Sequence, residues 1–160
     1  MFIRLIILFV SITNLGFTQS KKEIKKYDII AVTETITEVV DGKEITRNDS
    51  YKKFDKDGNV LEEVNYDKYG KLQERIVRIY DRFDNKTQEI TFDATNRQIK
   101  RETYKYDEMG EKNEEVEYNA KNLVVSRSVF ITDRRGLKSE KKVYDSKGKL
   151  IQTKKYRYDD

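Results

Sequence analysis

The sequence predicts an all-β fold, an antiparallel up-and-down meander of tandem β-hairpin repeats that forms one elongated, twisted or spiralling sheet. Three observations lead to this fold class. A short turn motif recurs through most of the chain, a residue that tolerates positive φ stands at its fifth position, and the segments between motifs are rich in Val, Ile, Thr and Tyr. A helical fold is disfavoured, because these residue types have low helix propensity and a turn motif interrupts them at short, regular intervals.

Residues 1–18 form a separate segment, predicted to be a secretory signal peptide. A positive charge at Arg4 precedes an apolar run from Leu5 to Ile12, and the small residues Gly16 and Thr18 follow. The run is shorter than the roughly 20 apolar residues of a transmembrane helix. An uncleaved membrane anchor is therefore the less favoured alternative, and we expect no integral membrane segment in the mature chain. The expected location is periplasmic or extracellular, in a cell of Gram-negative type.

Residues 19–53 are expected to form N-terminal strands and a hairpin. An Asp-Gly pair, Asp41-Gly42, separates the strand expected at Tyr27–Val40 from the one expected at Lys43–Phe54. Asp-Gly between two such segments is a strong signal for a two-residue hairpin turn.

Residues 54–160 are expected to form the repeat sheet. A complete copy of the motif has an aromatic residue (Thr at 132), then Asp (Asn at 119), and three positions later Gly, Asn or Asp. Copies begin at Phe54, Tyr66, Tyr80, Phe92, Tyr106, Tyr118, Thr132 and Tyr144, and a truncated copy begins at Tyr158. A short interval, as from Phe54 to Tyr66, alternates with a longer one, as from Tyr66 to Tyr80. The repeating unit therefore spans one short and one long interval and contains two turns.

The second and fifth positions of the motif predict the type of turn. Asp at the second position accepts hydrogen bonds from the backbone just ahead, and the fifth residue takes the left-handed conformation that closes a three-residue hairpin loop. The residues assigned to these structural roles are Asp55, Gly58, Asp67, Gly70, Asp107, Gly110, Asp145 and Gly148.

The even spacing of the motif predicts one aromatic face. If each aromatic pairs with the residue six positions later, all even-numbered strand residues from Phe54 onward lie on the same side of the sheet. That side is either one face of a single-layer sheet wetted on both sides or the inner wall of a spiral. The candidate ligand-binding residues on it are Tyr66, Tyr80, Phe92, Tyr104, Tyr106, Tyr118, Tyr144 and Tyr156. Cross-strand packing that holds the sheet together is the competing interpretation of this ladder.

The odd-numbered side is expected to be mainly charged and polar. Ile79, Ile99 and Val125 are among its few apolar members.

The composition excludes most familiar catalytic chemistry. With no His and no Cys, the chain has no Ser-His-Asp triad, no thiolate nucleophile and no His- or Cys-liganded metal. We expect no cofactor and no metal, and we interpret the calcium-loop-like segment Asp55-Lys56-Asp57-Gly58-Asn59 as a turn, since its glycine is displaced and its flanks are strands. The adjacent acids Glu62-Glu63, Glu114-Glu115 and Asp159-Asp160 are interpreted as solvated charge, because neighbours on a strand point to opposite faces.

The segments Tyr66–Leu72 and Tyr144–Leu150, with the pattern aromatic-Asp-x-x-Gly-Lys-Leu, resemble the YD repeats of Rhs and teneurin-like bacterial surface proteins. The resemblance covers Phe54 to Asp160, with spacing tighter than in that family. It implies β-hairpins that wind into an extended or shell-like sheet on an exported protein, with carbohydrate as a ligand class.

The function expected from the sequence is non-catalytic binding by an exported repeat protein. The partner would be a surface polysaccharide or another envelope protein, bound through the aromatic face or a sheet edge. Nucleic acid is not expected as a partner, because positive and negative side chains are interleaved along the chain rather than clustered. The alternative is a structural or self-assembling envelope element, in which open edge strands pair between copies.

Overall fold

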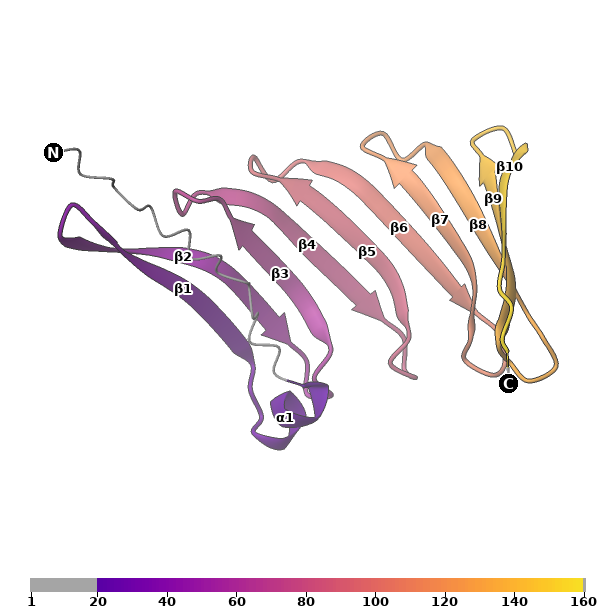
Figure 1. Ribbon diagram of the computed structural model, residues 1–160, viewed down its shortest axis with the longest axis horizontal. Coiled ribbons are helices and arrows are strands. Elements are labelled where there is room, and N and C mark those ends of the chain that lie inside the picture. The colour runs from indigo at the N-terminus through magenta and orange to yellow at the C-terminus, as the bar shows by residue number, and fades with distance from the viewer. Residues whose placement is uncertain (1–19, 160) are drawn as a thin grey trace, which may run out of the picture.

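The computed structural model describes residues 20–159, so the expected signal peptide lies outside the described residues. Ten strands form one antiparallel sheet in simple sequence order (Figure 1). The strands are β1 (Ala31–Val40), β2 (Lys43–Phe54), β3 (Val60–Tyr66), β4 (Leu72–Tyr80), β5 (Lys86–Asp93), β6 (Gln98–Tyr106), β7 (Lys112–Asn119), β8 (Val124–Thr132), β9 (Lys138–Asp145) and β10 (Leu150–Lys155). The predicted fold class, an up-and-down all-β meander, is confirmed.

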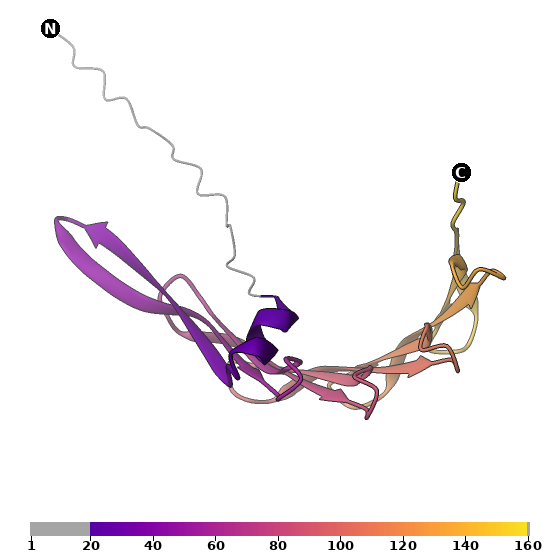
Figure 2. The same cartoon turned by 90° about the horizontal axis from the view of Figure 1, so that it is seen from below.

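The sheet is a single open layer that bends into a crescent (Figure 2). One short helix, α1 (Lys21–Lys26), lies on the inner side of the crescent near the lower ends of β1 and β2. Among residues 20–159, no helix is both long and apolar enough to span a bilayer.

The turns of the repeat region have the predicted geometry. In each, the backbone N–H of the second motif residue donates to the carbonyl four positions later, as Asp67 does to Lys71 at 2.8 Å. The Asp67 carboxylate in turn accepts hydrogen bonds from the N–H groups of Tyr69 (2.8 Å) and Lys71 (2.9 Å). The fifth position has positive φ in every copy, whether it holds Gly, Asn or Asp. The Asp and Gly residues of the motif therefore determine these turns.

The pairing next to each turn also follows the prediction, but the strands then shift register by one position. Tyr66 pairs with Leu72, whereas Asn65 pairs with Glu74 and Val64 with Arg75. A bulge of this kind occurs beside every turn from β2 to β10. Because directly paired residues share a face, even-numbered residues of one strand lie beside odd-numbered residues of the next.

The prediction of one even-numbered face is therefore wrong. Parity reverses at each bulge, so consecutive motif aromatics point to opposite sides and every second one points to the same side. Phe54, Tyr80 and Tyr106 lie on the face that α1 contacts, here called the concave face. The opposite, convex face carries Tyr66, Phe92, Tyr118 and Tyr144.

The two faces differ in crowding, as bending predicts. Side chains converge on the concave face, where Ser50, Thr91, Tyr104 and Ser128 are buried. Exposed strand residues from β3 to β9 lie on the convex face: Gln73, Ile79, Ile99, Lys105, Val124, Val125, Arg127 and Ile131. Ile79, Ile99 and Val125, which were expected opposite the aromatics, thus share the convex face with half of them.

The N-terminal segment differs from the expected strand. Residues 21–26 are helical, and the first strand begins at Ala31 rather than at Tyr27. Ser20 and Glu23 form a capping box, in which the Ser20 hydroxyl accepts from the Glu23 N–H and the Glu23 side chain accepts from the Ser20 N–H. This signal was present in the sequence, but the β pattern of the following residues obscured it.

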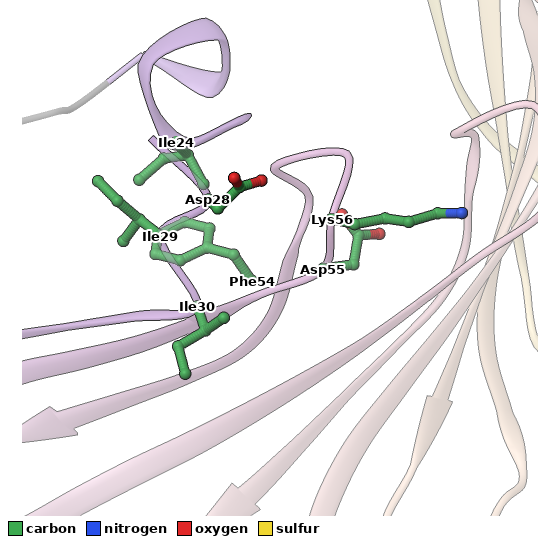
Figure 3. A pocket seen from close by; sticks show the side chains of 7 residues that line it. All are labelled: Ile24, Asp28, Ile29, Ile30, Phe54, Asp55 and Lys56. Atoms are coloured by element: carbon green, nitrogen blue, oxygen red, sulfur yellow. The ribbon is translucent and has the colours of Figure 1, made fainter. Parts of the chain in front are cut away.

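The most buried side chain of the described residues is Ile24, which is 1% exposed. Ile24, Ile29 and Phe54 gather where α1 meets the end of β2, around a cavity of about 150 Å³, and Lys56 extends away from them (Figure 3). Apart from this junction, the only buried hydrophobic side chain in residues 20–159 is Tyr104, so most of the sheet is held by cross-strand pairs.

Candidate functional site on the concave face

The predicted aromatic ladder is divided equally between the two faces. Tyr66, Phe92, Tyr118 and Tyr144 lie on the convex face, and Tyr80, Tyr104, Tyr106 and Tyr156 belong to the concave side. No single surface gathers all eight residues. The aromatics of the two faces contact different neighbouring side chains and therefore differ in what they can bind or stabilise.

Three motif tyrosines tie together the two strands of a hairpin at its open end. The hydroxyl groups of Tyr80, Tyr106 and Tyr158 donate to the backbone carbonyls of Val60 (3.1 Å), Lys86 (2.9 Å) and Lys138 (2.9 Å).

We call these three hydrogen bonds the tyrosine clasps, since each joins a tyrosine at or just after the end of one strand to the start of the preceding strand. Burial raises the pKa of Tyr80 and of Tyr106, which keeps both phenols protonated as donors. For Tyr80 and Tyr106 the packing interpretation of the ladder is supported.

On the convex face, arginines stack on motif aromatics. The guanidinium of Arg75 lies 5.1 Å from the ring centre of Phe92, and that of Arg101 lies 3.9 Å from the ring centre of Tyr118. These contacts cover the aromatic rings and leave less of them available to a ligand.

On the concave face, lysines alternate with aromatic rings between the middle and the C-terminal strands. The ammonium of Lys86 lies 4.7 Å from the ring centre of Tyr104, and that of Lys112 lies 5.0 Å from Tyr104 and 4.9 Å from Phe130. The ammonium of Lys138 lies 5.3 Å from Phe130. The three lysines occupy equivalent positions in successive repeating units, as do the two aromatics, so the row repeats with the hairpin pair.

The charge of this row changes along the sheet. Lys86 donates to Glu89 at 2.8 Å, and Lys112 donates to Glu115 at 2.5 Å. The residue equivalent to Glu115 in the next repeating unit is Lys141, whose ammonium lies 5.3 Å from the Phe130 ring centre.

Within residues 20–159, neither Lys138 nor Lys141 forms an ion pair. The cluster of Lys112, Phe130, Lys138 and Lys141, here called the Phe130 cluster, therefore carries excess positive charge on a half-buried surface.

Acidic residues line the centre of the concave face beside this cluster. Glu89 pairs across the sheet with Glu102, and Glu102 pairs with Glu117. Lys100 lies 3.1 Å from Glu102. Burial opposes ionisation of Glu89, but hydrogen bonds from Lys86 and Arg78 lower its pKa below the usual value.

Tyr104 lies among these acidic groups. Burial, together with the charges of Glu102 and Glu89, raises the pKa of Tyr104, so its phenol stays neutral.

The calcium-loop-like segment has a structural role. The Asp55 carboxylate accepts from the N–H groups of Asp57 and Asn59, both at 2.9 Å, and Asp57 pairs with Lys25 at 2.9 Å. Across the part of the chain that the structure describes, no three acidic side chains gather closely enough to hold a metal ion. The segment therefore acts as a turn in this structure.

The adjacent acids Glu62 and Glu63 diverge as expected, whereas Asp160 of the predicted pair Asp159-Asp160 lies outside the described residues. Glu62 accepts from Arg75 on the convex face (2.5 Å), whereas Glu63 accepts from Arg78 on the concave face (2.8 Å). The two acids bind different partners and do not form a two-carboxylate site.

Sequence reasoning did not find the lysines of the concave row. Their signal was the regular recurrence of Lys86, Lys112 and Lys138, each directly after one of the lower turns in Figure 1. Only the strand register shows that these lysines flank Tyr104 and Phe130, each of which lies shortly before a lower turn.

Comparison with models of known families finds no match, and comparison with curated proteins finds none either. Among solved structures, the chain is similar to the crystal structure of TarM, with a TM-score of 0.32 and 19% identity over 88% of this chain and 25% of that chain. It is also similar to a mutant of S. aureus TarM in complex with Fondaparinux, alpha-GlcNAc-glycerol and UDP, with a TM-score of 0.33 and 16% identity over 86% of this chain and 25% of that one. This chain spans a quarter of the length of those chains, and overlaps this weak assign neither a family nor a function.

Proposed function

We propose that this chain is an exported, non-catalytic binding protein whose concave face binds an anionic surface polysaccharide. The observation that carries the proposal is the Phe130 cluster, in which the ammonium groups of Lys112, Lys138 and Lys141 lie 4.9, 5.3 and 5.3 Å from one aromatic ring centre. An aromatic ring offers a flat apolar surface to a sugar ring, and the lysines attract carboxylate, sulfate or phosphate groups.

A polymer is favoured over a small ligand because the lysine and aromatic positions repeat. Phe130 lies two strands along the sheet from Tyr104, so the two rings are about 10 Å apart at ordinary strand spacing. A chain with a regularly repeated acidic group can contact the Phe130 cluster and then the Lys86 and Lys112 pair around Tyr104. The expected signal peptide and the resemblance to YD repeats support export and a cell-surface role.

The test is binding of the mature protein to acidic and neutral polysaccharides. We expect polygalacturonate or hyaluronan to bind, dextran to bind far more weakly, and the affinity for the acidic polymers to fall as salt is raised. The double variant Lys138→Gln/Lys141→Gln should lose about tenfold or more in affinity, because a hydrogen bond to a charged group contributes about 1.5–3 kcal/mol.

The matched control is Lys142→Gln. Lys142 is adjacent in sequence but lies on the convex face, 3.1 Å from Glu140, so its loss should leave the affinity unchanged. Equal binding of acidic and neutral polymers, or equal loss in both variants, would exclude the Phe130 cluster as the binding site.

A structural role through self-association is the second candidate. Within residues 20–159, β1 and β10 each have a partner strand on one side only, and every residue of β10 is exposed. Unpaired strand edges can pair with another copy. Sedimentation velocity over a wide concentration range tests this candidate, and a monomer at the highest concentration would eliminate it.

A further inference from the structure

A hollow lies on the convex side of the sheet, at the turn between β9 and β10. Its volume is about 370 Å³, and its lining residues are Val124, Arg127, Tyr144, Asp145, Ser146 and Gly148. That volume lies within the range of about 300–1,000 Å³ that is usual for small-molecule sites.

In the two preceding repeats, side chains occupy the corresponding place. The Asn122 side-chain oxygen accepts from Arg101 Nε at 3.0 Å and from Gln98 Nε2 at 3.1 Å. The Asn96 side-chain oxygen accepts from Arg75 at 3.3 Å. In both repeats, the asparagine accepts a hydrogen bond from the arginine that stacks on the motif aromatic.

The last repeat has glycine instead of asparagine at this position. Gly148 offers no side-chain acceptor, and a Cβ atom built on it would meet no other atom within 4 Å. Arg127 pairs in register with Tyr144, as Arg101 does with Tyr118. In the described part of the chain, however, Arg127 makes no contact with the Tyr144 ring within the usual cation–π distance of about 6 Å. The ring of Tyr144 is thus left without an arginine over it.

The groups around the hollow suit an uncharged polar ligand with one apolar side. Arg127 donates to Glu114 through Nε at 2.7 Å, and the ammonium of Lys105 lies 2.7 Å from the other oxygen of Glu114, so two cations share this carboxylate. The Arg127 side chain remains 51% exposed. The hydroxyls of Tyr144 and Ser146 have no hydrogen-bond partner within residues 20–159, and Val124 supplies an apolar wall.

We propose that this hollow binds a neutral hexopyranose ring, which stacks on Tyr144 and bonds to Arg127 and Ser146. A free anion is disfavoured there, because the carboxylates of Glu114 and Asp145 together balance the charges of Arg127 and Lys105. The site would add a carbohydrate contact on the convex side, and it does not depend on the Phe130 cluster.

The test is ligand-detected NMR with methyl glycosides of glucose, galactose, mannose and N-acetylglucosamine. We expect saturation transfer from the wild-type protein to at least one glycoside, insensitive to salt. Gly148→Asn should abolish the transfer by filling the hollow, and Asn fits the backbone because Asn96 and Asn122 already adopt positive φ of 60° and 57° at this position.

Two controls make the result specific. Asn122→Gly changes the same position in the preceding repeat and should retain the signal. Lys138→Gln/Lys141→Gln should also retain the saturation transfer. If the proposed function is correct, the same double variant has a lower affinity for acidic polymers. Absence of transfer to all four glycosides, or an undiminished signal from folded Gly148→Asn, would overturn the inference while leaving the Phe130 cluster untouched.

Discussion

The two ends of the sheet are stabilised differently. At the N-terminal end, α1 packs Ile24 against Phe54, and Lys21 donates to the side-chain oxygens of Asn59 (2.6 Å) and Asp84 (3.2 Å). At the C-terminal end, β10 is exposed along its whole length. A repeat sheet in which each hairpin contacts only its neighbours needs a cap at its ends. Within the described residues, a helical cap is present at one end only.

Both proposed binding sites lie toward the uncapped end. The Phe130 cluster and the Gly148 hollow are built from β7 to β10 and their turns, where Lys141 and Gly148 replace the glutamate and the asparagine of the two preceding repeating units. The comparison indicates that the N-terminal end contributes stability, and under the two proposals the C-terminal end contributes recognition.

The largest expected effect is at the cap. Ile24→Ala should lower the free energy of unfolding by about 2–5 kcal/mol, since Ile24 is 1% exposed and packs in the apolar junction between α1 and the end of β2. Ile151→Ala, at a residue 59% exposed in β10, should change it by about 0.5 kcal/mol or less. Urea denaturation followed by circular dichroism measures both, and similar losses would contradict the unequal ends.

Two glycines with nearly the same φ distinguish the cost of backbone strain from the cost of a steric contact with α1. Gly58→Ala should destabilise by about 2–4 kcal/mol, because a Cβ there would lie 2.7 Å from the Lys21 carbonyl oxygen of α1, in addition to the cost of φ +81°. Gly110→Ala, at φ +80° with no atom within 4 Å, should cost only about 1–2 kcal/mol. Thermal melts of the pair give the difference, and equal costs would mean that α1 does not press on this turn.

The tyrosine clasps test how far the stabilising pattern can be extended toward the open end. Tyr106→Phe should cost about 1 kcal/mol through loss of its hydrogen bond to Lys86. Thr132 stands where a clasp tyrosine would be, so Thr132→Tyr should add a bond to the Lys112 carbonyl and stabilise by about 1 kcal/mol. Chemical denaturation measures both changes.

The control for the clasps is Tyr118→Phe, on the convex face, which should be neutral. A loss of stability in Thr132→Tyr would show that the clasp cannot be extended to this hairpin.

The smallest effect concerns acid sensitivity of the turns. The Thr95 hydroxyl and the Arg97 N–H lower the pKa of Asp93 far below its usual value of about 3.9. A depressed folded pKa means that this carboxylate stabilises the fold above about pH 3.9 and loses that contribution as the pH falls. Asp93→Asn should keep the turn and flatten the fall of melting temperature between pH 4 and pH 2. An unchanged pH profile would exclude Asp93 as a contributor.

The local parts of this fold could be predicted from sequence because their causes are local. Asp67 and Gly70 specify their turn by hydrogen bonds and φ values within the turn itself, and the strand residues between turns have no competing helical preference. The repeat then fixes the order of the strands, since a turn this short can only join neighbours. The capping box of Ser20 and Glu23 was equally local, and only the competing β pattern concealed it.

The candidate site could be predicted only in its residue types. Tyr104 and Tyr144 were identified as aromatics of interest, yet their placement on opposite faces, and the lysines around the Phe130 cluster, follow from the bulge beside each turn. A bulge shifts pairing by one position and exchanges the faces of every residue beyond it. The sequence by itself determined the turns, the strands and their order. The tertiary structure decided which side chains meet, because register depends on hydrogen bonds between strands that no single strand encodes.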